Sequence, residues 1–206
     1  MRLYLSSFRL GGHPDRLVRL SAGRRVAVIA NALDGLSAAI RETSVRRDFA
    51  DLIPLGLEVS EIDLRDADAA RRLRGVDMVW VRGGNVFALR RALADTGTDQ
   101  VLTDLIKSDA IAYGGYSAGA SVLAPDLTGF EQVDDMTTVL DPVMTGLGVL
   151  DRPLVPHVRS PGLLESAACD ALAARYQNTG QPHWALRDGE VLIVDGDNTE
   201  LLGIVS

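Results

Sequence analysis

Residues 110–126 have the sequence AIAYGGYSAGASVLAPD, which predicts a buried strand that turns tightly into a helix. A short apolar run ends in two glycines, and a serine follows after one tyrosine. The chain then continues in residues as small as alanine and glycine. Small residues at such a turn serve either close packing or the exposure of Ser117. The rest of the chain has to distinguish these two interpretations.

Short apolar runs alternate with longer amphipathic segments before this stretch. Continuous apolar strands separated by helices are typical of a parallel sheet covered on both faces. The predicted strands cover 2–6, 25–32, 57–64, 76–83 and 110–115, and the predicted helices lie near 35–54, 66–74 and 86–108.

The pattern changes after residue 126. A strand at 152–157 and a helix at 161–177 precede three further strands at 183–188, 190–196 and 199–206. Asp188-Gly189 and the Asp-Gly pair in 195–198 favour tight antiparallel hairpins. We therefore predict an α/β protein, a three-layer α/β/α sandwich with a mostly parallel sheet and an antiparallel C-terminal edge, as one domain over residues 1–206.

Composition limits the classes of function. A net charge of −7 argues against a nucleic-acid partner, which calls for a basic surface. The N-terminal apolar segment is too short for a signal peptide, and no apolar run reaches the roughly 18 residues of a membrane span. The lone Cys169 excludes an intrachain disulfide and is expected in the core. We expect a cytoplasmic protein without cofactor or metal, because the three histidines show no metal-ligand spacing.

Ser117 lies in the pattern G-x-S-x-G, formed by residues 115–119. In a nucleophile elbow the serine has strained backbone angles at a strand-to-helix turn, so the residues two before and two after must be small. Gly115 and Gly119 meet that requirement. The alternative is a packing turn whose serine caps the helix.

A serine nucleophile needs a general base. His157 follows a predicted strand end, where the side chains of such folds reach the reaction centre, and it is the favoured base. His13 lies in a glycine-rich loop and His183 opens a late strand. The carboxylate that orients the base is open between Asp188 and four alternatives: Glu190, Asp134, Asp135 and Asp141.

Gly83-Gly84-Asn85 follows another predicted strand and precedes a helix. Backbone N–H groups at such a turn can bind an oxyanion together with the N–H of the residue after the nucleophile. Here these would be Gly84 and Ala118. The alternative is a glycine turn with Asn85 as a helix cap. The chain has no P-loop, which argues against a nucleotide site.

The motifs RGGNVFAL (82–89), YGGYSAGAS (113–121) and VPH (155–157) occur in this order. With them the chain resembles the peptidase E (aspartyl dipeptidase) and cyanophycinase superfamily, which has a class I glutamine amidotransferase-like fold. The resemblance implies a serine peptidase with Ser117 as nucleophile and His157 as base, and with Gly84 and Ala118 at the oxyanion positions.

The chain departs from that family at two places. Peptidase E has a glutamate as third catalytic residue, and the matching stretch LRDGEVL has Asp188 there. Peptidase E also has an arginine in an E-T-R-E-like segment that holds the substrate's aspartate, whereas the matching stretch PGLLESAACD has none. Asn85 and Arg159 remain candidate substrate-binding residues. Strict specificity for an N-terminal aspartate is therefore not implied.

The leading hypothesis is a serine peptidase that cleaves short peptides from the N-terminus. The order Ser117, His157, Asp188 distinguishes it from an α/β-hydrolase esterase, in which the acid precedes the histidine. A third hypothesis is a non-catalytic binding or regulatory protein on the same scaffold. Residues 6–15 and 133–146 are expected to border the site. The antiparallel C-terminal edge could pair with a second copy, so a homodimer is one expectation.

Overall fold

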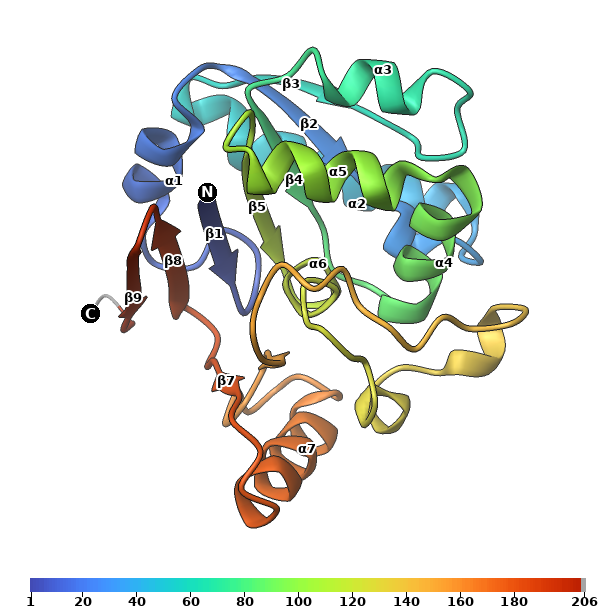
Figure 1. The fold of residues 1–206 in the computed structure, drawn as a ribbon, viewed down its shortest axis with the longest axis vertical. Helices are drawn as coiled ribbons and strands as arrows, with labels where there is room; N and C mark the ends of the chain where they lie inside the picture. Colours follow the sequence, from blue (N-terminus) through green and yellow to red (C-terminus); the bar gives the residue numbers. More distant parts are fainter. Residues whose placement is uncertain (205–206) are drawn as a thin grey trace.

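A seven-stranded sheet runs through the computed structural model, which describes residues 1–204 (Figure 1). The strand order is β3-β2-β4-β5-β1-β8-β9. The first five strands are parallel, while β8 is antiparallel to β1 and β9 to β8. The strands are β1 (Arg2–Ser6), β2 (Arg25–Ile29), β3 (Glu58–Glu61), β4 (Met78–Val81), β5 (Ala112–Tyr116), β8 (Val191–Asp195) and β9 (Asn198–Leu202).

Helices cover both faces of this sheet, as the apolar strands predict. On one face, Tyr4 and Trp80 pack with Leu17 of α1 and Leu52 of α2. On the other face, alternate strand residues pack with α3, α4, α5, α6 and α7. The helices are α1 (Pro14–Ser21), α2 (Ala38–Leu52), α3 (Ala69–Leu73), α4 (Val86–Thr96), α5 (Thr98–Lys107), α6 (Ala118–Ser121) and α7 (Ser166–Asn178). The α/β sandwich with a mostly parallel sheet is thus confirmed.

Two helical predictions need correction. The single helix expected near 86–108 is two helices, because Gly97 has a φ of 65° and ends α4 in the left-handed conformation. The glycine-rich loop expected around residue 13 contains α1, which starts at Pro14 with Asp15 in its first turn. A proline at the first helical position favours a helix start, and that signal was present in the sequence.

The segment after residue 150 also differs from the expectation. The strands predicted at 152–157 and 183–188 shorten to β6 (Leu154–Val155) and β7 (Trp184–Ala185), which pair in parallel as a separate two-stranded sheet. The Asp188-Gly189 turn therefore does not close an antiparallel hairpin: it links this small sheet to β8 of the main sheet. The hairpin between β8 and β9 is confirmed. The predicted strand at 199–206 ends in part outside the described residues.

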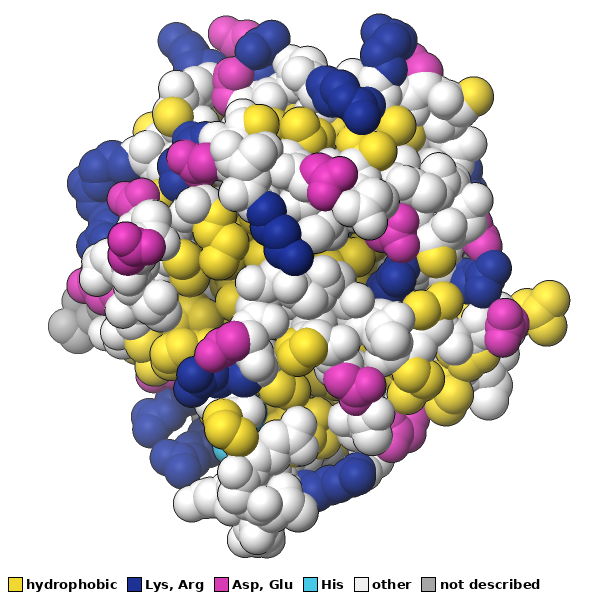
Figure 2. All heavy atoms as spheres, viewed as in Figure 1, with side chains coloured by type: hydrophobic (Ala, Val, Ile, Leu, Met, Phe, Trp, Pro, Cys, Tyr) yellow, Lys and Arg dark blue, Asp and Glu magenta, His cyan; other side chains and the backbone are white. Residues whose placement is uncertain are grey.

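Residues 1–204 also contain four short 3₁₀ turns: η1 (Asn31–Leu33), η2 (Ile53–Leu55), η3 (Phe130–Gln132) and η4 (Met136–Thr138). Acidic and basic side chains are interspersed over the face shown in Figure 2. Among residues 1–204, no helix has both the length and the apolar character needed to cross a bilayer.

Candidate active site

Ser117 lies directly between β5 and α6, at the carboxyl end of a central strand. Its backbone angles, φ 51° and ψ −122°, belong to a region that a residue with a side chain rarely adopts. Two residues later, a Cβ on Gly119 would lie 2.0 Å from the carbonyl oxygen of Val81 on β4. The turn thus packs backbone against backbone.

A second turn, after β4, faces this serine. Gly84 has a φ of 147°, and a Cβ there would lie 2.4 Å from the carbonyl oxygen of Ala32. The neighbouring Asn85 N–H donates to that same carbonyl at 2.8 Å. Within residues 1–204 the N–H groups of Gly84 and Ala118 donate to no other residue. Two free backbone donors are therefore available beside the Ser117 turn.

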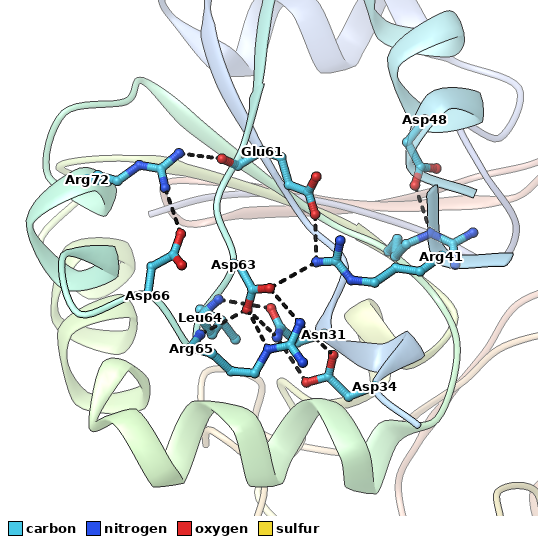
Figure 3. A network of polar contacts seen from close by, with 11 residues as sticks. Asn31, Asp34, Arg41, Asp48, Glu61, Asp63, Leu64, Arg65, Asp66 and Arg72 are labelled. Carbon is cyan, nitrogen blue, oxygen red and sulfur yellow. Dashed lines mark hydrogen bonds and ion pairs between the residues drawn. The ribbon is translucent and has the colours of Figure 1, made fainter. Parts of the chain in front are cut away.

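A polar network holds η1, and with it Ala32, in place (Figure 3). The amide nitrogen of Asn31 donates to Asp63 and Asp34, both at 3.0 Å, and its amide oxygen accepts from the Leu64 N–H at 3.1 Å. Hydrogen bonds from Arg65 and Asn31 outweigh burial and hold the pKa of Asp63 below its usual range. The charged carboxylate thereby ties η1 to the end of β3, behind the Gly84 turn.

His157 comes from the segment that follows β6, and its ring meets a carboxylate from a distant part of the chain. Its Nδ1 lies 2.8 Å from Oδ1 of Asp188. The Ser7 hydroxyl bridges the pair, since it donates to the same Asp188 oxygen and accepts from the His157 backbone N–H, both at 2.7 Å. The His157 side chain is buried and Asp188 is about three-quarters buried. The contact has the geometry in which a carboxylate selects the imidazole tautomer with a proton on Nδ1.

Hydrogen bonds keep Asp188 ionised at this position. Burial opposes its charge, but the bonds from His157 and Ser7 outweigh burial, so the pKa of Asp188 lies below its ordinary value. The Asp188 backbone N–H donates to the Ser160 hydroxyl at 2.9 Å, and the Ser166 hydroxyl donates to the His157 carbonyl at 2.9 Å. His157 itself has a φ of 58°, so neighbouring hydroxyl groups stabilise an uncommon backbone conformation.

Three of the four alternative acids are engaged elsewhere, whereas Asp134 lines the cavity but forms no hydrogen bond with His157 in the described chain. Glu190 accepts from the Arg187 N–H within its own turn at 2.8 Å, Asp135 accepts from the Thr137 N–H at 2.9 Å, and Asp141 lies 3.5 Å from Arg91. The other histidines are also engaged away from Ser117. His13 contacts the carbonyl of Gly203, and His183 contacts that of Gln181 and packs on Tyr176.

The serine and the histidine open into one cavity of about 340 Å³. Gly84, Ala118, Ser117 and His157 all line it. The remaining wall is largely apolar and comes from η1, α2, η3 and the loop before α7, with Phe8, Leu33, Ile40, Phe130 and Leu163. A cavity of this size, apolar with a few polar groups, is typical of a small-molecule site.

Asp134 and Glu165 add negative charge to this cavity. Asp134 Oδ2 accepts from the Val86 N–H at the start of α4, at 2.7 Å, while Oδ1 accepts from no other residue in the described chain. Burial raises the pKa of Asp134 to about 6, and the charge of Glu165 adds to that rise. One carboxylate oxygen of Asp134 is therefore free to bind a cation in the cavity.

A buried ion pair lies next to the Ser117 turn, in contact with Tyr116. Arg82 donates through Nε to Asp48 at 2.8 Å, and the Tyr116 hydroxyl donates to the other Asp48 oxygen at 2.9 Å. Burial raises the pKa of Asp48, and the charge of Arg82 opposes that rise. Because both charges are almost fully buried, we expect the Arg82 guanidinium to remain in the ion pair with Asp48.

The two candidate substrate-binding residues occupy other positions. The side-chain oxygen of Asn85 accepts from the N–H groups of Phe87 and Ala88, at 2.9 and 3.0 Å, so Asn85 caps α4. Arg159 is exposed and does not line the cavity. Cys169 is buried. Within the part of the chain that the structure describes, no three His, Cys, Asp or Glu side chains converge as metal ligands.

Some site residues were not singled out by the sequence patterns. Residues 6–15 and 133–146 were expected to border the site, and Phe8, Val133 and Asp134 do line the cavity. The bridging role of Ser7 and the position of Arg47 in the cavity were missed. Ser7 directly follows β1, so its place at a strand end was an available signal. Arg47 had none, because it is one of several arginines on an amphipathic helix.

Comparisons with known proteins place the chain in a family. The family model Peptidase_S51, described as peptidase family S51, matches residues 24–202. Peptidase E of Streptomyces coelicolor is 30% identical over 188 residues, which cover 89% of this chain and 73% of that protein. A Drosophila melanogaster protein named "Probable alpha-aspartyl dipeptidase" is 26% identical over 214 residues, covering 98% of this chain and 85% of that protein.

The fold agrees with this placement. A crystal structure of a Listeria monocytogenes EGD-e protein assigned to peptidase E superimposes with a TM-score of 0.83 at 22% identity, and the match covers 99% of this chain and 98% of the other. A peptidase from an acI-B1 Actinobacterium superimposes with a TM-score of 0.73 at 16% identity, covering 98% and 87%. The chain belongs to peptidase family S51 and is a peptidase.

Proposed function

We propose that the protein is a serine dipeptidase that hydrolyses short peptides at their N-terminal residue through an acyl-enzyme on Ser117. One observation carries the proposal: the His157–Asp188 contact of 2.8 Å opens into the same cavity as a serine with a φ of 51°. Strained backbone at a serine that faces a paired histidine is typical of a nucleophile elbow.

The reaction would follow the serine, histidine and acid scheme. His157 Nε2 takes the proton of the Ser117 hydroxyl as the oxygen attacks the scissile carbonyl carbon. The N–H groups of Gly84 and Ala118 donate to the oxyanion that forms. His157 then gives its proton to the leaving amine, the C–N bond breaks, and a water molecule activated by His157 hydrolyses the ester. Asp188 keeps the proton of the imidazole on Nδ1 throughout.

The serine hydroxyl forms no hydrogen bond within residues 1–204. In enzymes of this kind the bond between nucleophile and base often tightens only when substrate is bound. The carboxylates of Asp134 and Glu165 support a substrate with a free amino terminus, because the unused oxygen of Asp134 can accept from an ammonium group.

The substrate class is a short peptide without a strict requirement for N-terminal aspartate. The Drosophila relative is named as an alpha-aspartyl dipeptidase. In this chain, however, the segment 161–170 has no arginine, and Arg82 is already bound to Asp48. A neutral N-terminal side chain fits the apolar wall of the cavity.

The test is hydrolysis of Asp-Leu, Leu-Leu and Ala-Leu by purified protein and by Ser117→Ala, together with labelling by a fluorophosphonate probe. We expect hydrolysis and labelling by the wild type, and loss of both in the variant. Ser121→Ala is the control. The Ser121 hydroxyl donates to the Leu154 carbonyl, so we do not expect it to attack the substrate. Unlabelled, inactive wild-type protein that is folded would support a binding protein instead.

A further inference from the structure

Arg47 is a charged residue of the cavity that the mechanism above does not use. It lies on α2 with Ile40 and Ser44, at spacings of seven and three residues, so the three side chains share one helix face and line the cavity. Of its helix neighbours, Arg41 pairs with Glu61 and Arg46 with Glu42. Among the described residues, Arg47 forms neither an ion pair nor a hydrogen bond.

Arg47 lines the cavity together with Phe8, Tyr116 and His157. The Phe8 ring packs edge-on against both Tyr116 and His157, with centroids 6.4 and 6.1 Å apart. Burial and the charge of Asp48 raise the pKa of Tyr116, while the positive charges of Arg82 and Arg47 act against that rise. Since His157 protonates the leaving amine, the residue that is released would lie along this Tyr116–Phe8–His157 edge.

The opposite charge lies on the other side of the sheet. Asp134 is bound to the first N–H of α4, beside the Gly84 turn, and α4 packs on the face of the sheet opposite to α2. Ser117 lies between β5 and α6, at the carboxyl end of a central strand of the sheet that separates these two layers. The cavity therefore has a cationic group on the α2 side and an anionic group on the α4 side of the nucleophile.

We propose that Arg47 binds the C-terminal carboxylate of the substrate, so that the enzyme selects free dipeptides. The inference rests on the proposed function and extends it to the released residue. An extended dipeptide spans about 7 Å and carries its two opposite charges at its ends. A planar guanidinium binds a carboxylate through two parallel hydrogen bonds, which a C-terminal amide cannot reproduce.

The experiment compares four substrates, Asp-Leu and Leu-Leu, each as the free acid and as the C-terminal amide. We expect the wild type to prefer both free acids. Arg47→Ala should raise KM for the free acids by about tenfold to a hundredfold, with kcat nearly unchanged, and leave the amides unaffected. Arg47→Lys should restore part of the preference. Arg46→Ala is the matched control, because Arg46 is exposed and pairs with Glu42.

An unchanged preference for free acids in Arg47→Ala overturns the inference. A second outcome would also overturn it: Arg47→Ala raises KM equally for Asp-Leu and its amide but leaves KM for Leu-Leu unchanged. Arg47 would then bind the side chain of the N-terminal aspartate rather than the C-terminal carboxylate.

Calorimetry on Ser117→Ala separates this inference from the proposed function. Tighter binding of the free acids than of the amides, abolished by adding Arg47→Ala, supports the carboxylate site even if the wild type hydrolyses none of the four. Equal binding of acid and amide, or no binding of any probe, overturns it.

Discussion

The two halves of the candidate active site are built in different ways. Ser117 directly follows β5, and the Gly84 turn follows β4. These two strands are adjacent in the centre of the main sheet. His157 and Asp188 come from segments flanking the small β6–β7 sheet, and Ser7 joins them from the end of β1. The serine half is held by backbone packed against backbone. The histidine half is held by hydroxyl and carboxylate hydrogen bonds across the chain.

Because the two halves are held differently, substitutions should affect a different property in each. A backbone contact has no flexible end that can move aside, so an added methyl group there disrupts the fold itself. A hydrogen-bonded side chain can be replaced by a near-isostere that keeps the fold and changes only the chemistry. Substitutions of the glycines in the serine half should therefore act on stability, and those in the histidine half on kcat.

The largest effect should follow Gly119→Ala. The new Cβ would lie 2.0 Å from the Val81 carbonyl oxygen, so β4 and α6 would have to separate. We expect a loss of more than about 4 kcal/mol in the free energy of unfolding, measured by urea denaturation. Gly203→Ala is the control, because a Cβ there meets nothing within 4 Å. Equal stability of the two variants would contradict the tight packing of the elbow.

The next largest effect should follow Asp188→Asn, in the histidine half. The amide is nearly isosteric but no longer selects the tautomer with Nδ1 protonated, so kcat should fall by about 10³–10⁴-fold with little change in unfolding free energy. Steady-state kinetics on the best dipeptide measures this. Glu190→Gln should leave kcat unchanged, since Glu190 only accepts from its own turn. The reverse result would assign the acid to Glu190.

A smaller effect should distinguish Asp134, which lines the cavity, from Asp188, which contacts His157. The folded pKa of Asp134, about 6, exceeds its unfolded value of about 3.8, so the folded state retains the proton longer. The charged carboxylate therefore destabilises the fold increasingly as pH rises from about 4 to 6.

Asp134→Asn should thus be more stable than the wild type above about pH 6, by at most about 3 kcal/mol, and equal to it below about pH 4. Urea denaturation across this range measures the difference. Asp135→Asn is the control, because hydrogen bonds from Thr137 lower the pKa of the exposed Asp135. A stability gain that does not depend on pH would argue against burial of the Asp134 charge.

The smallest effect concerns strain at the nucleophile. Both Ser117→Gly and Ser117→Ala remove the hydroxyl, but only glycine adopts a φ of 51° with a ψ of −122° without a steric penalty. Ser117→Gly should unfold at a free energy about 1 kcal/mol above that of Ser117→Ala. At Ser121, inside α6, the order should reverse, because glycine weakens a helix. Greater stability of the alanine variant than of the glycine variant at both positions would show that Ser117 is unstrained.

How well the sequence predicts each half follows from the same contrast. The Ser117 turn is specified by residues within five positions of each other, so sterics alone indicate it. The Asp188 contact joins residues 31 positions apart, and Ser7 closes the network from 150 positions before His157. Only a family resemblance singled out Asp188 among five carboxylates. The hydrogen-bond geometry then distinguishes it from Glu190, which is two residues away.

The sequence by itself determined the alternation of strands and helices, the two glycine turns and the position of the serine between β5 and α6, because each depends on local sterics and periodicity. Only the tertiary structure showed that His157 lies outside the main sheet and that Arg47 and Asp134 enter one cavity from opposite faces. Those facts depend on which distant segments meet, and neither periodicity nor spacing carries that information.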